Sequence, residues 1–139
     1  VAADGSETAW RALNNVVEIG KKFESEILVV NVIQPYNNAA LLAVPLDHAT
    51  INQGNSELEK VGDKVLELAK EMVGSYPHKV EYDMEVGHPS ERIIALSKKV
   101  EADAIVLGSR GLSGIAEFFL GSVSSKVSQY ATVPVLIVK

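Results

Sequence analysis

Short apolar runs alternate with longer amphipathic stretches along the chain. Residues 27–33, ILVVNVI, are nearly all apolar and β-branched, which is typical of a parallel strand covered on both faces. Residues 1–3, 104–107 and 133–138 form similar runs, and residues 79–86 alternate apolar with polar side chains, which favours an edge strand. The pattern predicts five strands. The first of them reads as a strand already under way, so we expect a short native N-terminus ahead of it.

Four amphipathic stretches separate these runs. The first follows Ser6, which can cap a helix, and its apolar positions recur at helical spacing over about 18 residues. The second covers residues 52–75, the third opens with Pro89 in its first turn, and the fourth begins near Val123. Strand and helix therefore alternate. This order predicts one domain over residues 1–139, an α/β fold of the Rossmann-like kind with a single open, mostly parallel five-stranded sheet and helices on both faces.

Composition and charge narrow the classes of function. The net charge of −5 provides no basic face for a nucleic-acid backbone, although it does not exclude a single nucleotide. The absence of cysteine excludes a disulfide framework and thiolate metal sites, and the three histidines lack metal-ligand spacing. No apolar run reaches membrane-spanning length and no signal peptide is visible. We therefore expect a cytoplasmic protein that binds neither nucleic acid nor membrane.

Two connections are candidates for function. Residues 34–50 form a long loop with an apolar insert, either a lid or partner surface or a segment packed on the core. The other connection follows the strand at 104–107: Gly108-Ser109-Arg110-Gly111, nine further residues, then Gly121-Ser122. Glycine permits close approach and φ values that other residues avoid, and a helix N-terminus offers unpaired N–H groups with partial positive charge. This second connection predicts a phosphate site. Phe118-Phe119-Leu120 within it favours a hydrophobic plug.

A second polar exit, Asp4-Gly5-Ser6, follows the first strand. Ligands of open α/β sheets lie beyond the carboxyl ends of strands, so the two exits face one crevice if the first and fourth strands are neighbours. A structural alternative for Asp4 stays open, because its carboxylate can accept hydrogen bonds from the turn N–H groups of Ser6 and Glu7. The dinucleotide fingerprint and the P-loop ending are absent, and the third strand ends in Val86-Gly87-His88, without the acidic residue that a receiver domain needs there.

These residues resemble the ATP-binding branch of the universal stress protein family. The motif of that branch is glycine, two residues, glycine, nine residues, glycine and Ser or Thr. The chain matches it at Gly108, Gly111, Gly121 and Ser122 without a change of spacing. The likeness also covers the Asp-Gly-Ser start, residues 29–33 and residues 134–138, so it spans essentially the whole chain.

The resemblance implies a sheet of order 3-2-1-4-5, a homodimer through the last strand, and ATP across the ends of strands 1 and 4. It implies that Asp4 faces the ribose or a phosphate-bound Mg²⁺, and that Val32 holds adenine through its backbone. Gly108 and Gly111 would shape the phosphate loop. Gly121, Ser122 and Val123 would bind the phosphates at the start of the last helix. Ser109 and Arg110 also lie in the motif, and their roles stay open because the family varies there.

The leading interpretation is an ATP-binding regulatory or stress-response protein. No Ser-His-Asp grouping, carboxylate pair or metal cluster marks a catalytic set, so any enzymatic activity is expected to be slow ATP hydrolysis with Asp4 placing Mg²⁺. The alternative is a dimeric interaction module of the same fold whose crevice is empty or holds another metabolite.

Overall fold

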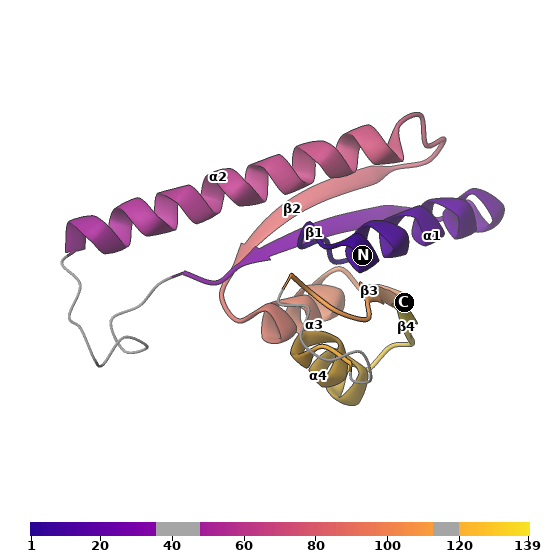
Figure 1. Ribbon diagram of the computed structural model, residues 1–139. Helices are drawn as coiled ribbons and strands as arrows, with labels where there is room; N and C mark the ends of the chain where they lie inside the picture. The colour runs from indigo at the N-terminus through magenta and orange to yellow at the C-terminus, as the bar shows by residue number, and fades with distance from the viewer. Residues whose placement is uncertain (36–47, 113–119) are drawn as a thin grey trace.

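The computed structural model describes residues 1–35, 48–112 and 120–139 of the chain. Helices and strands alternate within these ranges, which confirms the α/β class (Figure 1). The elements are α1 (Glu7–Phe23), β1 (Ile27–Ile33), α2 (His48–Val73), β2 (Val80–Val86), α3 (Pro89–Lys99), β3 (Ile105–Gly108), α4 (Ser122–Tyr130) and β4 (Val135–Val138). The second helix therefore begins four residues earlier than its apolar periodicity predicts.

The four described strands form two parallel pairs. β1 pairs with β2 from Ile27 opposite Val80 onward, and β3 pairs with β4 from Ile105 opposite Val135 onward. The prediction of a single five-stranded sheet is therefore wrong for the described residues, which form two two-stranded sheets. The difference lies in the first predicted strand, residues 1–3.

Residues 1–3 lie between the two pairs and form an isolated bridge instead of a strand. The Ala3 N–H donates to the Val30 carbonyl at 2.9 Å, and the Ala2 N–H donates to the Val106 carbonyl at 3.2 Å. The segment makes one bridge, between Ala2 and Val30, and no ladder. The hydrogen-bonded order is nevertheless β2, β1, residues 1–3, β3, β4. The ends of residues 1–3 and of β3 are thus neighbours.

Apolar clusters on the two faces of this arrangement hold the helices in place. One cluster joins α1 and α2 to β1 through side chains that include the fully buried Leu13 and Val29. The other joins α3 and α4 to β1 and β3, with the fully buried Val127 at its centre. Helices therefore cover both faces, as the sequence predicts, and Figure 1 shows α2 and α3 on opposite sides of β1.

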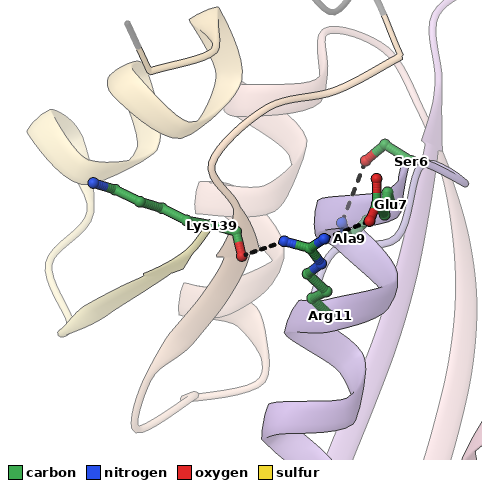
Figure 2. A network of polar contacts seen from close by, with 5 residues as sticks. All are labelled: Ser6, Glu7, Ala9, Arg11 and Lys139. Carbon is green, nitrogen blue, oxygen red and sulfur yellow. Dashed lines mark hydrogen bonds and ion pairs between the residues drawn. The ribbon is translucent and has the colours of Figure 1, made fainter. Parts of the chain in front are cut away.

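The start of α1 is fixed by several polar contacts (Figure 2). The Ala9 N–H donates to Ser6 Oγ at 3.3 Å, so Ser6 is the N-cap that the sequence predicts. One turn later the Arg11 guanidinium pairs with Glu7 and donates to the Lys139 carbonyl at 3.4 Å. These contacts connect the beginning of α1 with the residue that follows β4. Among the described helices, none is both long and apolar enough to cross a membrane.

Candidate functional site

The two predicted polar exits meet in space. Ser6 Oγ and Thr8 Oγ1 donate to the Arg110 carbonyl at 3.2 and 2.6 Å. Asp4 reaches the same loop, because a Cβ added at Gly111 would lie 2.7 Å from Asp4 Oδ2. We call this meeting of residues 4–8 with residues 108–111 the exit junction. Both of its segments follow the carboxyl ends of neighbouring extended segments, where an open α/β fold binds its ligands.

Asp4 has one of the two structural contacts considered for it. The Ser6 N–H donates to Asp4 Oδ1 at 2.9 Å, which holds the side chain in an Asx turn. The other carboxylate oxygen, Oδ2, faces Gly111. The residue is solvent-exposed. Its carboxylate therefore stabilises the turn through one oxygen and directs the other toward the loop after β3.

Gly108 and Gly111 both lie close to other atoms of the protein. A Cβ at Gly108 would lie 2.5 Å from Thr8 Oγ1 and 2.7 Å from the Ala9 nitrogen. Neither glycine has a left-handed φ; the described glycines with positive φ are Gly5, Gly74 and Gly87. The expectation of unusual φ values in the motif is therefore wrong for these two positions. The physical reason for Gly108 is the close approach of the first turn of α1, and Gly111 leaves room for the Asp4 side chain.

Ser109 links the loop to α4 and to β4. Its N–H donates to the Val138 carbonyl at 2.7 Å, and its carbonyl accepts from the Gly121 N–H at 2.8 Å and from Ser124 Oγ at 3.0 Å. The side chain of Ser109 is buried. Its backbone groups thus bind other parts of the chain, so the described geometry gives Ser109 a structural role.

The N-terminus of α4 lies directly beside this link. Gly121 is its N-cap, with φ −60° and ψ 155°, no side-chain capping bond and no acidic residue in the first turn. Ser122 is the first helical residue and is exposed. The N–H groups of Ser122 and Val123 belong to the first turn, which has no intrahelical acceptor for them. Such a terminus favours an anion.

Val32 presents its backbone toward the first exit. Both backbone groups of Val30 bond to residues 1–3, whereas the Ile33 carbonyl accepts from Gly87 on the β2 side. Backbone direction alternates along a strand, so the Val32 N–H and carbonyl point to the same side as those of Val30. That side lies past Ala3, where Asp4 follows. The backbone role that the resemblance implies for Val32 stays a prediction.

Sequence reasoning missed the contacts of three polar side chains in or near the exit junction. Ser6 was predicted as a cap and as part of the polar exit but not as a donor to Arg110, and Thr8 received no role, yet both donate to the Arg110 carbonyl. Asn31 Nδ2 donates to the Ala3 carbonyl at 2.7 Å and so fixes residues 1–3 on β1. A buried amide inside an otherwise apolar strand was the visible signal for Asn31.

Some predictions fall on residues that the structure does not describe. The apolar insert at residues 39–44 lies outside the described ranges, and so do Phe118 and Phe119 of the predicted plug. Leu120, the last residue of that plug, is described and 45% exposed.

A cavity lies at the other ends of the strands. It has a volume of about 780 Å³ and is lined by α1, α3, Val1, Ala2 and the first residues of β1 and β3, and by none of the predicted site residues. Its charged lining is mostly acidic: Glu24, Glu26, Glu81, Glu101 and Asp103. Lys79 also lines it, and its hydrogen bond to Glu81 raises its pKa. Clustered carboxylates repel phosphate, so size alone does not make this cavity the nucleotide site.

Comparisons with known proteins agree with these observations. The model of the universal stress protein family matches residues 1–139. Universal stress protein YxiE of Bacillus subtilis (strain 168) is 37% identical over 144 residues, which cover 100% of this chain and 96% of that protein.

Solved structures extend the likeness to the fold. The structure of the protein MJ0577 has a TM-score of 0.81 and 28% identity, and the match covers 99% of this chain and 92% of that one. A universal stress protein family member from Arabidopsis thaliana, solved with AMP bound, has a TM-score of 0.69 and 25% identity over 100% of this chain and 88% of its own. The chain belongs to the universal stress protein family.

Proposed function

We propose that this chain binds ATP at the exit junction and acts as a nucleotide-dependent regulatory or stress-response protein. One observation carries the proposal: Asp4 Oδ2 faces Gly111, while Ser109 in the same loop is bonded to Gly121 at the start of α4. A carboxylate, a glycine loop and an uncapped helix N-terminus are therefore combined in one place. The AMP-bound family member supports an adenine nucleotide as the ligand.

Each part of the junction suits one part of the nucleotide. The first-turn N–H groups of Ser122 and Val123 suit the phosphates, since they carry partial positive charge. Gly121 allows α4 to begin close to the loop, since a Cβ there would lie 3.3 Å from Arg110 Cα and from the Ser109 carbonyl oxygen, and Gly108 and Gly111 allow the loop to lie against residues 4–8. The Val32 backbone suits the adenine edge, which has both a donor and an acceptor. Ser109 holds the loop in place. We propose that Arg110 contributes to the site through its backbone groups.

A magnesium ion fits the proposal as a companion of the phosphates. Within the described ranges no group of three or more acidic or histidine side chains is placed to hold a metal by itself. Mg²⁺ in nucleotide sites keeps several waters and takes one or two carboxylates besides phosphate oxygens, so Asp4 alone suffices. When bound, the ion would reduce the charge of the phosphates. Asp4 is thus proposed to face the ribose or this ion.

We also propose a homodimer through β4. The strand sequence VLIV carries no charge, and Leu136 is 43% exposed. The opposite edge strand, β2, contains Glu81, Asp83 and Glu85. Charged side chains protect an edge from pairing, so the uncharged edge is the better candidate for a second copy.

Isothermal titration of the purified chain tests the nucleotide proposal. We expect ATP to bind, and to bind more tightly with Mg²⁺ present, because the ion offsets repulsion between Asp4 and the phosphates. Mass spectrometry of any ligand released from the purified protein provides an independent check. Absence of binding to ATP, with and without Mg²⁺, would reject the proposal in favour of the interaction module. Steady-state phosphate release above background would instead establish a true ATPase.

A further inference from the structure

We propose that Thr8, assisted by Ser6, is a positioning residue that locks the peptide unit between Arg110 and Gly111 with its N–H toward the phosphates. The inference rests on the proposed function and assigns a role to a hydroxyl group that the nucleotide motif does not contain. Thr8 lies in the first turn of α1, 102 residues away from Arg110 in the sequence.

Thr8 contacts both backbone groups of Arg110. Its Oγ1 donates to the Arg110 carbonyl at 2.6 Å and lies 3.4 Å from the Arg110 nitrogen, whose N–H points to it. Ser6 Oγ adds a second donor to the same carbonyl at 3.2 Å. The Arg110 N–H and carbonyl therefore both face α1.

Peptide planarity fixes the direction of the neighbouring groups. In a trans peptide unit the carbonyl and the N–H point in opposite directions. The Ser109 carbonyl shares a peptide unit with the Arg110 N–H, so it must point away from α1. Its hydrogen bond from the Gly121 N–H, at the start of α4, agrees with this direction. By the same rule the Gly111 N–H, which shares a peptide unit with the Arg110 carbonyl, points away from α1. It is directed to the side on which α4 begins.

The lock matters because the alternative orientation would oppose anion binding. A glycine at position 111 gives its peptide unit more rotational freedom than any other residue would. Rotation by half a turn would replace the Gly111 N–H with the Arg110 carbonyl, whose oxygen repels phosphate. Two hydroxyl donors to that carbonyl stabilise the N–H orientation. The missing Cβ of Gly108 is what lets Thr8 come this close, since a Cβ there would lie 2.5 Å from Thr8 Oγ1.

Thr8→Val tests the lock, with Thr8→Ser as the matched control. Valine keeps the shape of threonine and loses the hydroxyl, and serine keeps the hydroxyl. We expect Thr8→Val to weaken ATP binding roughly fivefold to tenfold, as for loss of one hydrogen bond, while adenosine affinity stays unchanged. Thr8→Ser should restore ATP binding. Ser6 is less suitable, because it also caps α1. Equal ATP affinity in wild type and Thr8→Val, or parallel losses for ATP and adenosine, would overturn the inference.

A second measurement separates failure of the lock from failure of the proposed function. Without ligand, the Gly111 amide resonance should be sharp in the wild type and in Thr8→Ser. In Thr8→Val it should show relaxation dispersion, because the freed peptide unit exchanges between two orientations on the microsecond-to-millisecond timescale. An unchanged Gly111 resonance in Thr8→Val rejects the lock. Wild-type protein that binds no adenine nucleotide rejects the proposed function, whatever the Gly111 resonance shows.

Discussion

At the residue scale, the loop after β3 is shaped by what lies against it inside the protein. Gly108 gives room to Thr8, and Gly111 gives room to Asp4. A side chain at either position would therefore act on the site without touching a ligand. The two positions differ in which atoms an added Cβ would displace. At Gly111 it would displace an exposed side chain, whereas at Gly108 it would also displace backbone atoms.

Gly111→Ala should change the position of the Asp4 carboxylate, and with it the affinity for ATP, without a large change in the stability of the fold. The new methyl group would lie 2.7 Å from Asp4 Oδ2 and displace the carboxylate, which an exposed side chain can accommodate. We expect ATP affinity to fall about tenfold, with a stability change within about 0.5 kcal/mol, as for most surface substitutions. Titrations of Gly111→Ala, Asp4→Asn and the double variant check the coupling. Losses that add fully in the double variant would contradict the displacement of Asp4.

Gly62→Ala should show how tightly Asn31 is packed. A Cβ at Gly62, in the middle of α2, would lie 2.8 Å from Asn31 Oδ1 and 3.0 Å from Met84 Cε. Overpacking costs about 1–3 kcal/mol, which outweighs the gain of about 1 kcal/mol from better helix propensity. Urea unfolding should therefore show a net loss of stability. The loss should shrink in an Asn31→Ala background, and an equal loss there would point to another cause.

At the element scale, the start of α1 has two tasks. Ser6 caps the helix by accepting from the Ala9 N–H (Figure 2), and its hydroxyl also donates to the Arg110 carbonyl, so it joins helix initiation to loop position. The Arg11–Glu7 pair on the next turn is more than half exposed on both side chains and adds little stability. The Ser6 and Thr8 hydroxyl groups, and not the ion pair, therefore hold the start of α1 against the loop after β3.

Ser6→Ala should destabilise the protein by about 1–2 kcal/mol, the usual cost of losing an N-cap. Thermal unfolding measures this change. Ser128→Ala is the matched control, because the Ser128 hydroxyl bonds only within the exposed side of α4 among the described contacts, to the Ser125 carbonyl at 2.8 Å. It should change stability by less than about 0.5 kcal/mol. Similar losses in the two variants would show that the cap is not the source.

Most elements could be predicted from the sequence because their apolar periodicity is local. The run at 27–33 coincides with β1, and the cap at Ser6 is confirmed. The split into two sheets could not be predicted, since a bridge and a strand differ only in how many residues form pairs. The prediction that the segments of Asp4 and Gly111 meet depended on an assumed strand order. The contact of Thr8 with Arg110 depends on side-chain packing between distant segments, which no local pattern encodes.

At the scale of the whole molecule, the two outer strands differ in character. β2 carries three acidic residues, and β4 carries none. The two ends of the strands also differ in charge. The cavity with the acidic lining lies at the strand ends opposite the exit junction. One end of the molecule is therefore suited to anions and the other is not.

Leu136→Glu should prevent pairing along β4. A buried carboxylate in a strand-to-strand interface costs several kcal/mol, which is enough to separate a modest dimer. Light scattering after size exclusion should show a dimer for the wild type and a monomer for this variant. Val86→Glu, at an apolar position of β2 with 48% exposure, is the matched control and should leave the mass unchanged. A wild-type monomer at all concentrations would reject the β4 interface.

The hydrogen bond from the Ser109 N–H to the Val138 carbonyl connects the loop after β3, where we propose that the nucleotide binds, to β4, the proposed contact strand. A second copy that orders β4 would then also order Ser109 and so raise the affinity for ATP. Thermodynamic reciprocity requires ATP to raise the affinity of the two copies for each other by the same factor. The apparent dissociation constant for ATP should consequently fall as the protein is concentrated. In Leu136→Glu it should stay constant, so dilution itself would act as a release signal.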